Sequence, residues 1–133
     1  MGTRAVINIE EDGSILVSIY RQFDGYPLGL GQDIKNILGN PKILNGHHGE
    51  TMPEAFNGMG CLSAYLVGNL KKSIGNIYII RACNNPREDC WAEYLYNLYT
   101  NDSKLFISVY DLMDDGRLLY DGLLSEWEIP FAK

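Results

Sequence analysis

The sequence has few basic residues and no extended cluster of them. Eleven Lys and Arg residues stand against seventeen Asp and Glu residues, which gives a formal net charge of −6 at pH 7. The only adjacent basic residues are Lys71 and Lys72. Duplex nucleic acid is bound chiefly by basic side chains that neutralise phosphates. We therefore expect no duplex nucleic acid partner, whereas a small anion in a local pocket is compatible with this charge.

Long apolar runs are also missing. No stretch approaches the roughly 18 apolar residues that indicate a membrane-spanning helix. The first residues lack the basic-then-apolar arrangement of a signal peptide, and Val6 stands where a myristoylation pattern has Ser or Thr. We expect a cytoplasmic protein with no membrane partner.

Cysteine and histidine are scarce, with three and two residues. An odd cysteine count without an export signal favours reduced thiols. Cys83 and Cys90 flank a short loop and could face each other across it. Neither they nor Cys61 combine with His47 and His48 in a zinc-binding spacing. We expect no structural metal and no cofactor.

Composition and patterning predict one globular α+β domain over residues 1–133. Hydrophobic residues make up 46% of the chain, a normal globular proportion. Alternating residues around Asp12-Gly13 predict a hairpin. The expected strands are 5–10, 15–23, 76–82, 90–99, 104–112 and 117–129, and the expected helices are 31–38 and 60–72. Lys42–Glu50 reads as a loop. This pattern predicts an antiparallel sheet of about six strands with two helices on one face, in the order ββααββββ.

The second predicted helix has two distinct sides. Its apolar stripe is Met59, Leu62, Leu66 and Leu70, and its stripe of small residues is Cys61, Ala64 and Gly68. The apolar stripe should face the sheet, and the small stripe should face either the short helix or a second subunit, with packing inside the chain favoured. Nine tyrosines suit an interface, so we also expect a homodimer or higher homo-oligomer.

Arg21 is the most informative charged residue. The alternation from Ile15 onward places it on the covered face of its strand, where an unpaired charge is too costly. It could pair with Asp24 and fix the following turn. It could also hold a phosphate or carboxylate, with Phe23 and Tyr26 stacking against a ring.

Two glycine-rich segments precede the predicted helices. Gly29-Leu30-Gly31 and Asn57-Gly58-Met59-Gly60 could present backbone N–H groups to an anion. Tight turns and close helix packing also explain these glycines, and we favour that explanation. No Gly-x-Ser-x-Gly nucleophile motif exists, and Cys61 with a loop histidine is a weak catalytic pattern. The chain is therefore more consistent with a binding protein than with an enzyme.

Four segments carry a family resemblance. They are Gly2–Arg4, Ile19–Pro27, Phe56–Leu62 and Ile74–Tyr78, and together they resemble small uncharacterised proteins of bacteriophages and prophages. The family has no assigned activity, so the resemblance implies a viral or mobile-element setting, in the host cytoplasm, and transfers no catalytic residue. Small acidic phage proteins often act on host defences by blocking a protein or sequestering a nucleotide signal.

We therefore expect a non-enzymatic protein that captures a small anionic ligand, for example a cyclic or ADP-ribose-type nucleotide signal, and so counters host defence. The expected ligand-binding residues are Arg4, Arg21, Phe23, Asp24, Tyr26, Asn57, Gly58 and Gly60. Two alternatives stay open. One is an inhibitor that binds a host protein through an acidic, tyrosine-rich face, and the other is a nucleotide-cleaving enzyme that uses His47 or His48.

Overall fold

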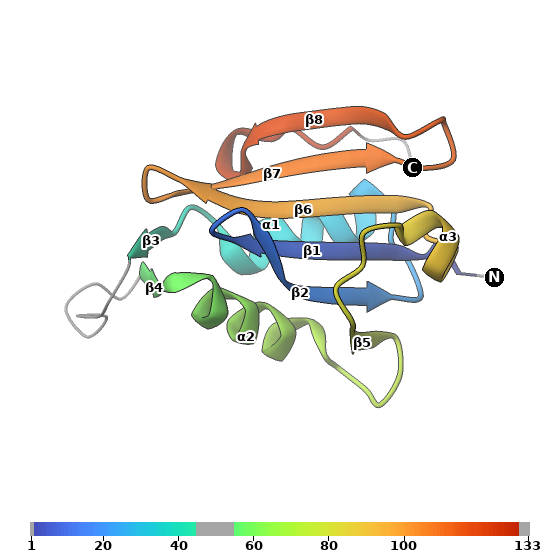
Figure 1. Cartoon of the computed structure of the whole chain (residues 1–133), viewed down its shortest axis with the longest axis horizontal. Helices are drawn as coiled ribbons and strands as arrows, with labels where there is room; N and C mark the ends of the chain where they lie inside the picture. Colours follow the sequence, from blue (N-terminus) through green and yellow to red (C-terminus); the bar gives the residue numbers. More distant parts are fainter. Residues whose placement is uncertain (1, 45–54, 131–133) are drawn as a thin grey trace.

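A computed structural model describes residues 2–44 and 55–130 of the chain (Figure 1). The strands are β1 (Ala5–Glu11), β2 (Ser14–Arg21), β3 (Lys42–Leu44), β4 (Ala55–Asn57), β5 (Ile77–Ile80), β6 (Tyr94–Asn101), β7 (Lys104–Asp111) and β8 (Arg117–Leu123). The helices are α1 (Gln32–Leu38), α2 (Gly58–Leu70) and α3 (Pro86–Cys90). A π-helical turn, η1 (Pro27–Gly31), leads into α1, and a 3-10 turn, η3 (Leu124–Glu126), follows β8.

The strands form one mixed sheet in the order β4-β3-β7-β6-β1-β2-β5, and β8 pairs with β7. The β1–β2, β2–β5, β6–β7 and β7–β8 pairs are antiparallel, as the sequence predicted. The β1–β6 and β3–β4 pairs are parallel, so the prediction of a purely antiparallel sheet is wrong. Parallel neighbours require a crossover connection. Here the long segment after β2 places β6 beside the free edge of β1.

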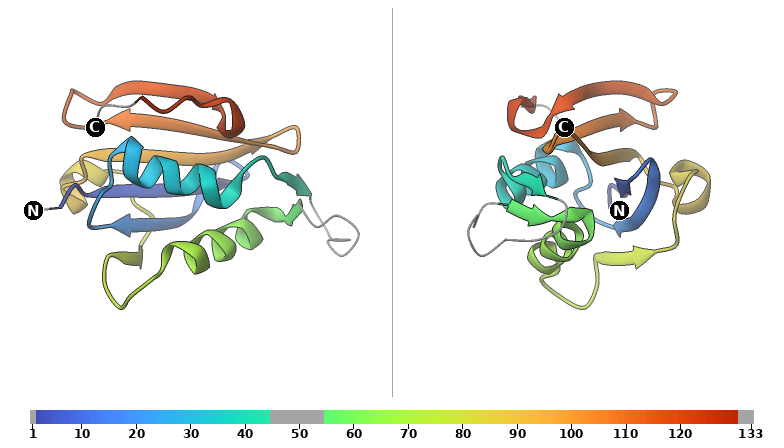
Figure 2. Two further views of the ribbon diagram at one scale, coloured as in Figure 1. Left: turned by 180° about the vertical axis from the view of Figure 1, so that it is seen from behind. Right: turned by 60° about the vertical axis from the view of Figure 1, so that its left-hand side comes forward.

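The sheet curls around its two main helices. The end-on view in Figure 2 shows α1 and α2 on the inner side of the curve and α3 on the outer side. The main core lies between the inner face and these helices, and it includes Ile7, Ile19, Tyr96 and Leu66. A smaller cluster on the outer face contains Val6, Cys83 and Ala92. Because Val6 and Ile7 are both fully buried, β1 is covered on both faces.

Three short elements were not predicted. β3 and β4 each have three residues, and β3 lies where the sequence indicated a loop. α3 occupies a segment read as a loop running into a strand, although Pro86 at its first turn is a common helix-start residue. Elements this short carry too few residues for periodicity to reveal them.

The two sides of α2 have different environments. Leu62, Leu66 and Leu70 are buried, as predicted. The small stripe is exposed at Cys61, Ala64 and Gly68, so the expectation that another part of the chain covers it is wrong. That a second copy of the protein covers this surface stays a prediction.

Within residues 2–44 and 55–130, no helix has the length and apolar character needed to cross a membrane.

Tyr96 offers a test of the inner core. Its hydroxyl group donates a hydrogen bond of 2.6 Å to the Gly25 carbonyl oxygen, and burial raises its pKa well above the ordinary value. Tyr96→Phe leaves this carbonyl without its donor, so we expect the free energy of unfolding to fall by about 1–2 kcal/mol. Urea denaturation measures the loss. Tyr110→Phe is the matched control, since Tyr110 is only half-buried, and an equal loss in both variants would contradict the assignment.

Candidate functional site

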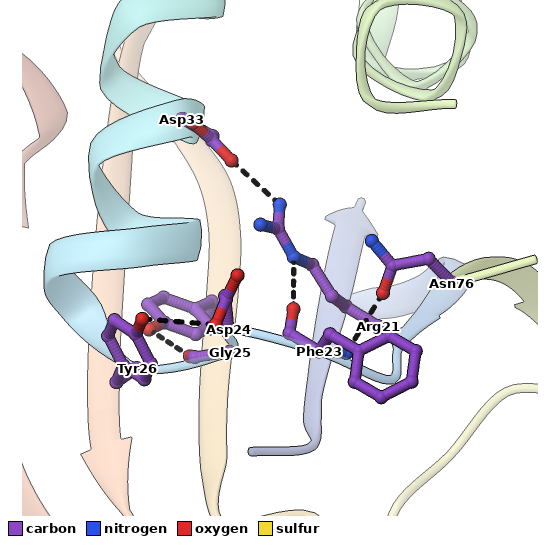
Figure 3. A network of polar contacts seen from close by, with 8 residues as sticks. Arg21, Phe23, Asp24, Gly25, Tyr26, Asp33 and Asn76 are labelled. Carbon is purple, nitrogen blue, oxygen red and sulfur yellow. Dashed lines mark hydrogen bonds and ion pairs between the residues drawn. The ribbon is translucent and has the colours of Figure 1, made fainter. Parts of the chain in front are cut away.

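Arg21 lies at the end of β2 with only 9% of its surface exposed. Its Nε donates to the Phe23 carbonyl oxygen at 2.7 Å, and its Nη1 donates to Asp33 Oδ2 at 2.8 Å (Figure 3). Asp33 is in the first turn of α1. The inward orientation of Arg21 was predicted correctly from strand alternation. Its partner was not, because Asp33 rather than Asp24 forms the ion pair.

The turn after β2 places α1 beside Arg21. Asp24 has a φ of 58°, a left-handed conformation that Asp tolerates better than most residues. Its carbonyl oxygen accepts a hydrogen bond from Leu30 N at 2.9 Å, and its carboxylate accepts one from the Tyr26 hydroxyl at 3.0 Å. A Cβ at Gly29 would lie 2.4 Å from the Asp24 carbonyl oxygen. Gly29 therefore serves close packing of the turn, the explanation favoured from the sequence.

Asn76 completes the frame around Arg21 from the opposite side. Its backbone carbonyl accepts a hydrogen bond from Gln22 N, and its side-chain Oδ1 accepts one from Phe23 N, both at 2.9 Å. Its φ of 70° is again a left-handed conformation that Asn tolerates. The preceding turn is held by Lys71 Nζ, which donates to the carbonyl oxygens of Ile74, Gly75 and Ile77.

A cavity of about 230 Å³, here named the Arg21 cavity, opens between α1, the end of α2 and the start of β5. It is lined by Arg21, Asp33, Asn36, Ile37, Asn69, Leu70, Lys72 and Asn76. Two cations against one carboxylate leave one net positive charge among the lining side chains. Three carboxamides add further hydrogen-bond donors. The arrangement suits a small anion.

Most of these lining residues were missed from the sequence. Asp33 and Asn36 are three residues apart on α1, and this spacing places both on one helix face, which is a signal that the sequence contained. Lys72 lies two residues beyond the end of α2, where helical spacing gives no such signal. The sequence also did not reveal that this face of α1 meets the end of α2 over the end of β2.

The predicted aromatic residues lie beside the cavity rather than in its lining. Phe23 is 46% exposed and contacts the N-terminal segment, since a Cβ on Gly2 would touch its ring. The Tyr26 hydroxyl donates to Asp24, as Figure 3 shows. Neither Phe23 nor Tyr26 is among the residues that line the cavity.

Arg4 lies on the outer side of the sheet. Its guanidinium stands 5.9 Å from the centre of the Trp91 ring, in a separate hollow of about 350 Å³. The structure therefore does not bring Arg4 and Arg21 together. Arg4 packs instead against the segment that contains α3.

Asn57, Gly58 and Gly60 lie at the start of α2, whereas the Arg21 cavity adjoins its other end. A helix of 13 residues is about 20 Å long, so one small ligand cannot reach both ends. Glu11 Oε2 accepts the Met59 N–H bond at 3.0 Å and takes the place that an anion would occupy. The adjoining hollow is acidic, with Glu11, Asp12 and Asp102 in its lining.

The outer face of the sheet carries a second polar arrangement. Strand registers align Ser18, Asn8, Asn97, Ser108 and Asp121 in one row across β2, β1, β6, β7 and β8. We name these five residues the outer polar row. Its β2 end is buried, where Ser18 Oγ donates to Asn8 Oδ1 at 2.5 Å. An open groove of about 510 Å³ lies over the row at Asn8 and Asn97.

The exposed end of the row contains a short hydrogen-bond network. Asp121 Oδ1 accepts from the Tyr99 hydroxyl at 2.5 Å and from Ser108 Oγ at 2.8 Å. These two bonds stabilise the carboxylate and lower the pKa of Asp121. Burial, together with the bond to Asp121, raises the pKa of Tyr99 to about 12. No group of three or more metal-ligating side chains occurs in the described ranges.

A mutant cycle tests the Arg21 pairing. Arg21→Ala should lower the free energy of unfolding by about 1–3 kcal/mol, because the Phe23 carbonyl and Asp33 both lose a charged donor. Asp33→Asn should cost only about 0.5–1 kcal/mol, since its side chain is 45% exposed. Asp24→Asn is the control and should change stability by less than about 0.5 kcal/mol. A coupling energy larger for Arg21 with Asp24 than with Asp33 would contradict this pairing.

The Asp121 network predicts a pH dependence. Because folding lowers the pKa of Asp121, its contribution to stability is complete above the ordinary carboxyl pKa of about 4 and is lost as the pH falls through the lower folded value. Asp121→Asn should therefore flatten the decrease in melting temperature between about pH 5 and pH 2. Calorimetry of the variant and the unsubstituted protein measures this decrease. An equal decrease in the two proteins would show that Asp121 does not contribute to the pH dependence of stability.

Comparison with protein-family models, with curated proteins and with solved structures found no match for this chain. The geometry of the Arg21 cavity and of the outer face therefore carries the functional argument.

Proposed function

We propose that this protein is a non-enzymatic binding protein that captures a small anionic ligand in the Arg21 cavity. The observation that carries the proposal is a nearly buried guanidinium, already oriented by Phe23 and Asp33, in the wall of a hollow that also contains Lys72. A preoriented guanidinium loses little entropy when it binds an anion, and it can offer two parallel donors to one phosphate or carboxylate.

The electrostatics of the cavity support an anion over a cation. The whole chain has a net charge of −6, whereas the cavity lining is net positive. Such a local reversal of sign concentrates anions at one place on an otherwise repulsive surface. The carboxamides of Asn36, Asn69 and Asn76 can donate to the remaining ligand oxygens.

The cavity volume limits what is enclosed. Pockets that bury a whole drug-sized molecule usually measure about 300–1,000 Å³, and the Arg21 cavity is smaller, at about 230 Å³. It can therefore enclose a phosphate or carboxylate with its nearest neighbours. The base of a nucleotide would extend outside, toward the exposed ring of Phe23. In this revised site Arg21 keeps the role expected from the sequence, and Asn57, Gly58 and Gly60 do not take part.

The biological setting is the wider part of the proposal. The resemblance to bacteriophage proteins and the anionic ligand class together favour sequestration of a nucleotide immune signal, such as a cyclic or ADP-ribose-type nucleotide. Binding without turnover is sufficient for this role. The rival cleavage activity depends on His47 and His48, which lie outside the described residues.

A ligand panel tests the proposal. Inorganic phosphate, AMP, ADP-ribose and a cyclic dinucleotide are titrated by calorimetry into the protein, and bound ligand is released by heat and analysed for chemical change. We expect at least one phosphate compound to bind and to be recovered unaltered. Arg21→Lys should weaken binding about ten- to hundredfold, because lysine cannot supply the bidentate donor pair.

Two control variants make the result specific. Lys72→Gln removes the second cation of the cavity and should weaken binding less than Arg21→Lys, since Lys72 is exposed. Lys104→Gln removes an exposed cation on β7, which is not among the lining residues, and should leave binding unchanged. Recovery of a cleaved product would contradict the proposal that the protein binds its ligand without turnover. Equal affinity of the Arg21→Lys variant and the unsubstituted protein would contradict binding in the Arg21 cavity.

A second candidate is binding of a host protein by the outer face. Tyr20, Tyr78, Tyr99 and Tyr110 project from this side, as their register with the outer polar row requires. Glu10 and Asp121 add negative charge beside them. Tyrosine combined with a charged periphery is typical of recognition surfaces. These residues support the alternative of an inhibitor that binds a host protein through an acidic, tyrosine-rich face.

A further inference from the structure

We propose that Cys83 and Cys90 form an oxidisable pair, a modification site at which a small-molecule disulfide such as oxidised glutathione closes an intramolecular Cys83–Cys90 bond. The site is separate from the Arg21 cavity and does not depend on the proposed function. It lies on the outer face, where α3 and its flanking residues pack against the sheet (Figure 1).

The two thiols are already together. Cys83 is buried in the outer-face cluster with Val6, the half-buried Cys90 packs against the same cluster, and the Cys90 thiol is close enough to raise the pKa of Cys83. Both are free thiols, and the segment from Cys83 to Cys90 spans eight residues. A bond between them would close a small ring around α3.

Hydrogen bonds fix the backbone at Cys83, so that its thiol keeps one position relative to Cys90. Cys83 N donates to Ser18 Oγ at 2.9 Å, and the Cys83 carbonyl oxygen accepts from Asn8 Nδ2 at 2.8 Å. At the other end, Trp91 holds a φ of 56°, a rare conformation for a bulky residue, and closes α3 immediately after Cys90. The buried end of the outer polar row is therefore the anchor of the thiol pair.

The two sulfurs have different roles in the reaction. Burial, followed by the charge and hydrogen bond of Cys90, raises the pKa of Cys83 to about 11, so Cys83 is a poor first nucleophile. The half-buried Cys90, as thiolate, attacks one sulfur of oxidised glutathione and releases a glutathione thiolate. Cys83 then loses its proton to solvent, attacks the Cys90 sulfur and releases the second glutathione. Two protein thiols are oxidised and one glutathione disulfide is reduced, so the step is balanced.

Oxidation of the two cysteines would change the two open hollows of the outer face. Asn84, inside the ring, lines the groove over Asn8 and Asn97. Arg87, also inside it, lines the hollow that contains Arg4 and Trp91, and its Nη1 donates to the Trp91 carbonyl oxygen at 3.1 Å. A disulfide that closes the ring would restrict the motion of Asn84 in the groove and of Arg87 in the hollow. The shape of the outer face, and so its affinity for any partner, would then depend on the oxidation state of the two cysteines.

The experiment uses the full chain with Cys61→Ser, which removes the exposed third thiol on α2. The native protein is incubated with oxidised glutathione, and its intact mass is followed. We expect a final product that has lost two hydrogens and retains no glutathione. Its melting temperature should rise by roughly 5–10 °C, because the ring restricts the unfolded chain.

Two double variants separate the sulfurs. Cys61→Ser/Cys83→Ala should accumulate glutathione on Cys90, since no second thiol can displace it. In Cys61→Ser/Cys90→Ala, Cys83 should react several-fold more slowly with oxidised glutathione than Cys90 does in the first variant, because burial limits access to Cys83 and still disfavours its thiolate. A stable glutathione adduct on the Cys61→Ser protein, or a disulfide between two chains, would overturn the proposal. Circular dichroism confirms that each variant is folded.

Discussion

A positive charge that is nearly removed from water must be paired, and the pairing of Arg21 determines how the chain is arranged after β2. The guanidinium binds the Phe23 carbonyl, which fixes the turn, and Asp33, which fixes the first turn of α1. α1 in turn packs on the inner face beside α2. The Arg21 cavity lies where these two helices converge on the end of β2, which carries the charge of Arg21. The same interaction thus supports the fold and orients the guanidinium in the cavity wall.

The second organising element is β1, which is buried on both faces. Ala5, Ile7 and Ile9 belong to the main core, whereas Val6 and Asn8 face outward beneath the α3 segment. A polar residue in such a strand needs a partner, and Asn8 finds it in the Cys83 carbonyl and Ser18. The hydrogen bonds that satisfy Asn8 also hold the thiol-bearing segment. The two faces of β1 therefore anchor the main core on one side and the thiol-bearing segment on the other.

The sequence predicted the features that depend on neighbouring residues. The Asp12-Gly13 hairpin, the inward direction of Arg21 and the apolar side of α2 are as expected, because each follows from strand or helix periodicity. The parallel pairing of β1 with β6 was not predictable in this way, since it joins residues about 90 positions apart, such as Ile7 and Tyr96. The prediction that Arg21 pairs with Asp24 was wrong for the same reason. Asp24 is nearer in sequence, but the orientation of α1, set by long-range packing, brings Asp33 to the guanidinium.

The two ends of α2 show why the proposed anion site lies where sequence patterns did not place it. A helix N-terminus attracts anions and a C-terminus repels them, yet the N-terminus of α2 is occupied by Glu11 and the Arg21 cavity adjoins its C-terminus. The helix dipole therefore opposes an anion in the cavity, and the first turn of α1 instead stabilises Asp33. A ligand in the proposed site would share the guanidinium with Asp33 and would also interact with Lys72. This arrangement would favour ligands with two negative charges, such as a phosphate monoester, over those with one, because the second charge can interact with Lys72 while the first engages the donors of Arg21 that Asp33 does not use.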